Sequence, residues 1–326
     1  MVGGWAAPNR SKNRRIGVDD RLNESSLPVV SVGLPVWNGE NYLREAVDSI
    51  LGQTMESFEL IIADNASEDG TEDICREYAE ADPRVRYFRH ESNLGAAPNY
   101  NFTLDQARGE FFLWTAHDDV RDHRFFESAL KQYDRVPDAA SVFSMAVRID
   151  DSGERLGSLP RPGTLTSSVP WERFGAAITC RHPGVVVFGL IRRSLLESTG
   201  RHGAYPGADR VLAAELALLG SLVEIPDVMF FNRDHPHRYV RLRDGGGRNA
   251  QSLWWDAARS GRVDAPALRR FAGYLRAVRK SGFTPTERAR CYSALAFASL
   301  DNGAGVLKEI LGDVVRSAVS RVRSRA

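Results

Sequence analysis

The chain has 326 residues, of which 43% are apolar and 26% are charged, and its formal net charge is +1 at pH 7. This composition is typical of a globular protein, so it excludes general disorder and an extended bundle of membrane-spanning helices. Because acidic and basic side chains nearly cancel, the overall charge gives no reason to expect a nucleic-acid partner.

The cysteines Cys75, Cys180 and Cys291 lie far apart and form no metal-type or redox-type pair, which favours a reducing cytoplasm. Basic residues occur near the start of the chain, but no long apolar run follows them. Residues 1–27 are therefore expected to form a flexible polar tail rather than a signal peptide or a spanning helix. We predict a cytoplasmic protein.

Strand and helix patterns alternate between residues 29 and 133. Short apolar runs that end at turn residues predict strands over 29–35, 58–63, 85–89 and 111–116. Apolar residues at helical spacing predict helices beyond Asn38 and over 71–81, 96–107 and 124–133. This alternation predicts an α/β fold with a doubly wound, mostly parallel sheet, in which ligands bind outside the carboxyl ends of the strands.

The regular pattern weakens after Asp150, where a loop rich in proline and glycine precedes mixed short elements that reach about Arg233. From Gln251 onward the pattern is helical. We therefore divide the chain into a tail at 1–27, a main domain at 28–240 and a helical extension at 241–326. Residues 305–326 place apolar side chains on one face beside arginines, which is typical of a helix on an anionic membrane or of a helix packed on protein.

Three loops that follow predicted strands carry side chains suited to a nucleotide. Trp37 lies where an aromatic ring would stack on a base, although core packing is the alternative. Asp64 stands at a strand end, where it would accept hydrogen bonds from base or ribose. Asp118 and Asp119 are adjacent carboxylates that repel each other unless they are solvated or bind a cation. Oxygen ligands suit Mg²⁺ or Mn²⁺ on a diphosphate, and an exposed acidic turn is the alternative.

Together these loops resemble the motifs of the inverting family 2 glycosyltransferases, which have the GT-A fold. The similar segments are PVWNGE at 35–40, DNASEDGT at 64–71, NLG at 93–95 with Asn99, and ARGE at 107–110. The resemblance covers about residues 28–237. It implies transfer of a sugar from a nucleotide-diphosphate sugar to an acceptor hydroxyl with inversion, in the synthesis of a bacterial polysaccharide, glycolipid or related glycoconjugate of the cell envelope.

The resemblance also implies roles for single residues. Asp209 matches the family's catalytic base, whereas by itself it would be interpreted as a helix cap. Asp118, supported by Asp119, matches the metal position for Mg²⁺ or Mn²⁺, and His235 matches a late Arg-x-His motif near the metal or diphosphate. The residues expected to bind the nucleotide sugar are Pro35, Trp37, Asn38, Glu40, Asp64, Asn65, Ser67, Asn93, Gly95, Asn99 and Asp118.

The sequence departs from the family pattern at several positions. Trp37 replaces the usual Tyr, Pro98 stands where Arg is common, Ala116 replaces the first Asp of Asp-x-Asp-Asp, and Ala208 stands where Glu is frequent. These departures leave open which carboxylate binds the metal, and whether the chain is a non-catalytic nucleotide-sugar-binding scaffold. A sugar nucleotidyltransferase is disfavoured because residues 36–40 offer no cation for a triphosphate. A glycan or lipid-linked acceptor is expected, and peripheral membrane contact through 305–326 and a homo-oligomer stay open.

Overall fold

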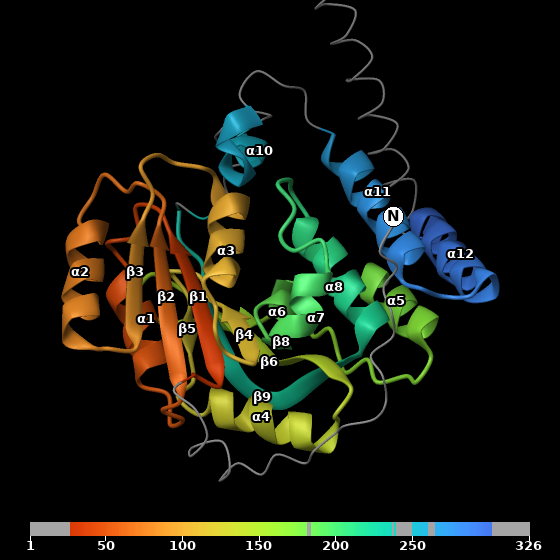
Figure 1. Cartoon of the computed structure of the whole chain (residues 1–326), viewed down its shortest axis with the longest axis horizontal. Coiled ribbons are helices and arrows are strands. Elements are labelled where there is room, and N and C mark those ends of the chain that lie inside the picture. Colours follow the sequence, from red (N-terminus) through yellow and green to blue (C-terminus); the bar gives the residue numbers. More distant parts are fainter. Residues whose placement is uncertain (1–26, 181–183, 237, 239–249, 260–264, 302–326) are drawn as a thin grey trace, which may run out of the picture.

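The computed structural model describes residues 27–180, 184–236, 238, 250–259 and 265–301. Within these residues a nine-stranded sheet has the order β3-β2-β1-β4-β8-β6-β9-β5, and β7 pairs with β6 beside this path. Helices cover both faces of the sheet (Figure 1). The expected amino-terminal tail, except Leu27, and the segment 305–326 lie outside the described residues.

The first half of the sheet is parallel and confirms the predicted alternation. Its strands are β1 (Val30–Val36), β2 (Phe58–Asp64), β3 (Val85–Arg89) and β4 (Phe111–Trp114). The helices that alternate with them are α1 (Leu43–Leu51), α2 (Thr71–Ala81), α3 (Ala96–Asp105) and α4 (Phe125–Arg135). The ends differ slightly from expectation, since β4 stops at Trp114 rather than at residue 116.

The second half of the sheet is mixed. Its strands are β5 (Val120–Arg121), β6 (Ala139–Ile149), β7 (Arg155–Ser158), β8 (Leu190–Arg192) and β9 (Ser221–Arg233). β8 runs antiparallel to β4 and β6, whereas β6 and β9 are parallel. Short elements lie between Asp150 and Gly220, as expected, whereas the segment up to Arg233 is the single long strand β9. A register irregularity near Pro226 breaks its alternating pattern and makes one strand look like separate pieces in the sequence.

Helix α3 packs closely on β1 because Gly33 has no side chain. A Cβ at Gly33 would lie 2.3 Å from Thr103 Oγ1 and 2.7 Å from a ring carbon of Phe112. The indole N–H of Trp114 donates a hydrogen bond of 2.9 Å to the carbonyl of Tyr100 on α3. The close contact and this bond fix α3 beside the carboxyl end of β4.

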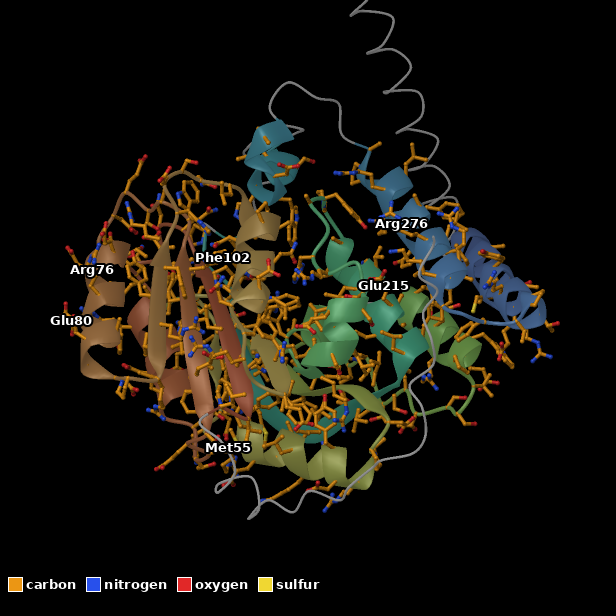
Figure 2. The ribbon with its side chains drawn as sticks, viewed as in Figure 1. Met55, Arg76, Glu80, Phe102, Glu215 and Arg276 are labelled. Carbon is orange, nitrogen blue, oxygen red and sulfur yellow. The ribbon has the colours of Figure 1, made fainter. Side chains whose placement is uncertain are left out.

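The carboxyl-terminal helices pack on the main domain. The carboxyl-terminal helices are α10 (Ala250–Trp255), α11 (Pro266–Lys280) and α12 (Pro285–Asp301), with a 3-10 turn at Ala257–Arg259. The helices of the second half of the main domain are α5 (Pro170–Thr179), α6 (Gly184–Val187), α7 (Arg193–Ser198) and α8 (Ala208–Leu219). α11 contacts α8 and α12 contacts α5; Glu215 on α8 and Arg276 on α11 lie on this side of the molecule (Figure 2). The described part of the extension is helical, as predicted.

The sheet separates two apolar cores. One lies against α1, α2 and α4, and the other lies against α3, α5, α8, α11 and α12. None of the described helices is both long enough and apolar enough to cross a bilayer.

Candidate active site

A cavity of about 1780 Å³ lies at the carboxyl ends of the parallel strands, where this class of sheet is expected to bind ligands. Its wall includes Trp37 after β1, Asn65 after β2, and Asp118 after β4. Asp209 at the start of α8 and His235 after β9 also line it. The structure therefore brings residues from five distant parts of the chain to one space.

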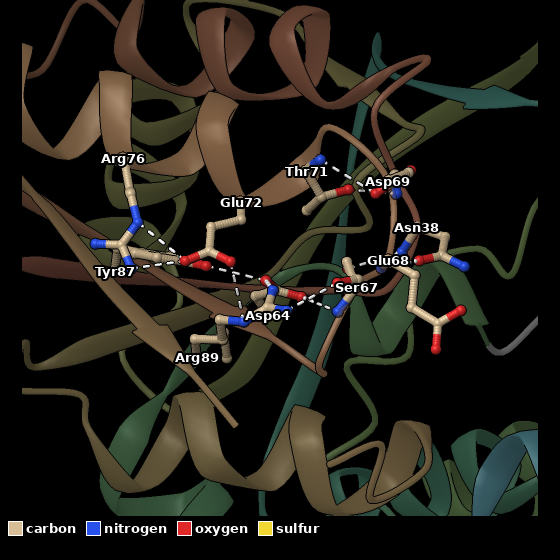
Figure 3. Close-up of polar contacts among 12 residues, drawn as sticks. Asn38, Asp64, Ser67, Glu68, Asp69, Thr71, Glu72, Arg76, Tyr87 and Arg89 are labelled. Atoms are coloured by element: carbon tan, nitrogen blue, oxygen red, sulfur yellow. Dashed lines mark hydrogen bonds and ion pairs between the residues drawn. The ribbon is translucent and has the colours of Figure 1, made fainter. Parts of the chain in front are cut away.

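The loops after β1 and β2 are hydrogen-bonded to each other (Figure 3). The amide N–H of Asn38 donates to Ser67 Oγ at 2.9 Å, and Asn38 Oδ1 accepts from the N–H of Glu68 at 2.9 Å. Glu40 Oε2 accepts from the N–H of Gly70 at 2.8 Å. Ser67 and Glu40 thus support the loops and are not among the residues lining the cavity, whereas Asn38 is.

Asp64 is fully buried behind the cavity wall. Its Oδ1 accepts from the N–H of Ser67 at 2.8 Å, while its Oδ2 accepts from the hydroxyl of Tyr87 at 2.9 Å and pairs with Arg89 (Figure 3). Arg89 also lies 3.2 Å from Glu72 on α2. Asp64 is occupied by these partners and is not among the cavity-lining residues.

The neighbouring residue, Asn65, does line the cavity. Its Nδ2 donates to Asn93 Oδ1 at 2.9 Å, and its Oδ1 accepts from the N–H of Leu94 at 2.9 Å. Asn93 and Asn99 also line the cavity, whereas Gly95 does not. Gly95 has φ 87°, and a Cβ there would lie 2.8 Å from the backbone after α10, so glycine permits this close approach.

The two adjacent carboxylates have different surroundings. Asp118 Oδ2 lies 2.9 Å from His235 Nε2 at the edge of the cavity. Asp119 is buried, and its Oδ1 accepts from the N–H of Arg233 at 2.9 Å and from Asn232 Nδ2 at 3.0 Å. Burial and the charge of Asp118 raise the pKa of Asp119. Burial opposes ionisation of Asp118 as well, but His117, His235 and Arg238 outweigh it and lower the pKa of Asp118.

These residues fit a hard divalent cation. Two neighbouring carboxylates repel each other in a buried place, as the raised pKa of Asp119 reflects, and a cation relieves that repulsion. The described residues contain no group of three or more His, Cys, Asp or Glu that would hold an ion by themselves. The set suits an ion that completes its coordination with phosphate oxygens, as Mg²⁺ usually does.

Arg233 is fully buried and ties four segments together. Its Nε donates to the carbonyl of Asp118 at 3.0 Å, and its Nη1 donates to the carbonyls of Asp150 and Asp151 at 2.9 and 3.1 Å. Its Nη2 pairs with Glu45 on α1. Of the Arg-x-His motif, His235 lines the cavity and Arg233 supports the loop that carries Asp118.

Asp209 is the second residue of α8 and lines the cavity. The N-cap position belongs to Gly207, which has φ 79°, and no side-chain cap is formed there. Burial raises the pKa of Asp209, although the charge of Arg210 and nearby backbone amides oppose this rise. A carboxylate that is partly desolvated and faces a cavity is suited to accept a proton.

Sequence reasoning missed several residues of the cavity wall. They are His117, Arg148, His202, Asn232, Arg238, Leu253, Trp254 and Trp255. They come from the loop after β4, from β6, from the loop between α7 and α8, from β9 and the loop after it, and from α10. The motifs assigned no role to any of them. Only their position next to matched residues, as for Asn232 and Arg238 around His235, could have indicated them.

The sheet order, the flanking helices and a cavity with paired carboxylates at the strand ends define a GT-A glycosyltransferase. The family model described as Glycosyl transferase family 2 matches residues 31–197, and the chain belongs to this family. The resemblance found in the sequence is thereby confirmed.

The chain is similar to proteins from bacteria and archaea. It is 40% identical over 95 residues to an uncharacterized glycosyltransferase of Rickettsia felis, a match that covers 28% of this chain and 15% of that protein. It is 32% identical over 176 residues to an uncharacterized glycosyltransferase of Methanocaldococcus jannaschii, covering 53% of this chain and 60% of that one. Both matches span less than two thirds of the relative.

Two solved structures have a similar fold. Staphylococcus aureus TarS 1-349 in complex with UDP is 16% identical, with a TM-score of 0.51, and the match covers 90% of this chain and 91% of that one. A mannosyltransferase from Pyrobaculum calidifontis in complex with GDP-Man and Mn²⁺ is 19% identical, with a TM-score of 0.51, and the match covers 90% and 76%. At these identities the likeness concerns the fold.

Proposed function

We propose that the protein transfers a sugar from a nucleotide-diphosphate sugar to an acceptor hydroxyl, with inversion at the anomeric carbon. The observation that carries this proposal is that Asp209 and the Asp118–Asp119 pair line the same cavity, at the strand ends of a GT-A fold. The complexes of similar folds with UDP and with GDP-Man support a nucleotide sugar as donor.

The donor's nucleotide would lie over the ends of β1 and β2. Trp37 is 44% exposed there and offers a ring for stacking on the base, and Asn65 faces the same space with a side chain held by its neighbours. Pro35, Asn38, Asn93 and Asn99 complete this wall. Four further residues would affect donor binding indirectly, because they hold the loops of this wall in shape: Glu40, Asp64, Ser67 and Gly95.

Asp118, Asp119 and His235 would hold a divalent cation, Mg²⁺ or Mn²⁺, together with the diphosphate. Such an ion neutralises the negative charge that develops on the departing diphosphate. The Mn²⁺ in the Pyrobaculum complex supports this expectation. Arg233 keeps the Asp118 loop in place through its bond to the Asp118 carbonyl.

Asp209 would take the proton from the acceptor hydroxyl as that oxygen attacks the anomeric carbon. Burial raises the pKa of this carboxylate, which makes it a stronger base than an exposed aspartate. Attack from the side opposite the departing diphosphate in one step inverts the configuration at the sugar. In this scheme Asp209 acts only as a base, and no covalent bond forms between the enzyme and the sugar.

The test is Asp209→Asn, with Asp227→Asn on the exposed part of β9 as the matched control. We expect kcat to fall by about 10²- to 10⁴-fold in the first variant and to stay unchanged in the second, with donor affinity retained in both. Donor turnover would be followed by release of nucleoside diphosphate. Equal turnover in wild type and Asp209→Asn would reject Asp209 as the base.

A non-catalytic scaffold is the second candidate, because Pro98, Ala116 and Ala208 stand where the family often has functional side chains. Tight donor binding without turnover by the wild type would favour it. For the active enzyme we propose a role in polysaccharide or glycolipid synthesis of the cell envelope, with a glycan or lipid-linked acceptor on the cytoplasmic side. The terminal segment proposed for membrane contact, 305–326, lies outside the described residues.

A further inference from the structure

His202 is a buried histidine in the wall of the cavity. It lies on the loop between α7 and α8, inside a group of aromatic rings. Its ring centroid is 4.7 Å from that of Tyr100, 4.6 Å from that of Trp114 and 5.7 Å from that of Trp255, which is stacked on it. His202 is 4% exposed. No motif in the sequence points to this residue.

Neither ring nitrogen of His202 has a hydrogen-bond partner among the described residues. Burial lowers the pKa of His202 to about 3, so the ring is neutral at physiological pH and carries one N–H donor and one nitrogen acceptor. Leaving such groups unpaired in the interior destabilises the folded state. A phenylalanine at this place in the cavity wall would have no unpaired polar atom, yet the chain has a histidine there.

The backbone holds the imidazole in place. Asn101 on α3 makes two hydrogen bonds with the backbone of His202, one to its carbonyl at 2.9 Å and one from its N–H at 3.1 Å. Two residues earlier, the N–H of Gly200 donates to Glu215 Oε2 on α8 at 2.9 Å. Arg201 has φ 55°, a left-handed conformation that is uncommon for a residue with a side chain. This loop is therefore fixed at several points.

The surroundings match the surface of a sugar ring. Tyr100 and Trp255 line the cavity and offer aromatic rings for the C–H groups of a pyranose, and the imidazole offers a donor and an acceptor for its hydroxyls. Tyr100, His202 and the carboxylate pair Asp118–Asp119 line the same cavity. A sugar attached to a diphosphate at Asp118 would lie on this side of the cavity.

We propose that His202 hydrogen-bonds a hydroxyl of the donor sugar and so contributes to the choice of sugar. The inference rests on the proposed function and adds a residue that recognises the sugar rather than the nucleotide. In this structure the ring nitrogens are covered. Trp255 belongs to α10, a helix of six residues, and the proposal requires this ring to move aside so that a hydroxyl reaches the imidazole.

The experiment measures how much the sugar adds to binding. Calorimetry with Mn²⁺ would give the Kd of UDP, GDP and dTDP, and of UDP-glucose, UDP-N-acetylglucosamine, GDP-mannose and dTDP-glucose. For the best-bound donor, the ratio of the diphosphate Kd to the donor Kd defines the sugar contribution. We expect His202→Phe to lower this ratio by about 5- to 10-fold, the equivalent of one hydrogen bond, and to leave the diphosphate Kd unchanged.

Two further measurements separate recognition from a structural role. His202→Gln keeps a donor and an acceptor and should retain more of the sugar contribution than His202→Phe. The melting temperature of His202→Phe without ligand should equal or exceed that of the wild type, because the variant buries no unpaired nitrogen. A lower melting temperature with an unchanged sugar contribution would overturn the proposal.

The remaining outcomes are also decisive. If His202→Phe weakens the diphosphates as much as the nucleotide sugars, His202 does not recognise the sugar. If the sugar contribution is unchanged but the KM of the acceptor rises, the residue belongs to the acceptor site and the proposal is wrong. If the wild type binds none of the diphosphates or donors, the proposed function itself fails, and this inference fails with it.

Discussion

Replacement of Arg233 by methionine should destabilise the protein strongly. The guanidinium is fully buried and donates to the carbonyls of Asp118, Asp150 and Asp151 at 2.9 to 3.1 Å. Its partner Glu45 is 54% exposed, so that ion pair adds little. The main cost comes from three carbonyls that lose a charged donor. An acceptor left without its donor typically costs about 1–3 kcal/mol, and with three carbonyls affected we expect a loss of about 3–5 kcal/mol in the free energy of unfolding.

Urea denaturation followed by tryptophan fluorescence measures this loss through the midpoint at constant m-value. Arg148→Met is the matched control: Arg148 is exposed on the neighbouring strand β6, lines the cavity, and should change stability by no more than about 0.5 kcal/mol. A loss of less than about 1 kcal/mol in Arg233→Met, together with loss of donor binding, would contradict a structural role for Arg233. That result would indicate that the Arg233 guanidinium binds the diphosphate of the donor.

Two further changes test burial and packing. Burial raises the pKa of Glu215 from 4.5 to about 7, so the folded state binds the proton more tightly and stability should fall as pH rises. Between pH 5 and pH 8 we expect the free energy of unfolding, measured by urea titration, to fall by about 2–3 kcal/mol in the wild type but not in Glu215→Gln. The same pH dependence in both proteins would contradict this expectation. Gly33→Ala should cost about 1–3 kcal/mol because its methyl meets Thr103, whereas Gly175→Ala, with its nearest atom at 3.5 Å, should raise the melting temperature.

The first half of the fold was predictable because its patterns are local. Each strand from β1 to β4 is a short apolar run that ends at turn residues, and each helix between them has apolar residues at regular spacing. The position of Asp118 at the cavity followed from the rule that ligands bind at strand ends. Asp209 required the family resemblance, since by itself it looked like a helix cap.

The direction of single side chains was not predictable in the same way. Successive residues of a strand point to opposite sides, so a motif at a strand end identifies a segment but not the residue that faces the ligand. Asp64 turns toward Arg89 and Tyr87, and Asn65 faces the cavity. Both side chains can bind a nucleotide by hydrogen bonds, so the residue types alone did not show which of the two faces the cavity.

The rest depends on contacts between distant parts of the chain. Asn101 holds His202 across more than a hundred positions of sequence, and no local pattern records such a pair. The irregularities in the pairing of β6 with β9 hide two long strands from any test of alternation. The Arg-x-His motif predicted a role for His235 and none for Arg233, whose bonds go to backbone carbonyls far away in the sequence.

The hydrogen bonds between the loops after β1 and β2 also bear on the thermodynamics of binding. Asn38 and Glu40 on one loop exchange bonds with Ser67, Glu68 and Gly70 on the other, so both loops are ordered before a donor arrives. A donor therefore loses little of its binding free energy to ordering them. The five residues should respond as one cooperative unit, so that the amides of both loops open together in hydrogen exchange.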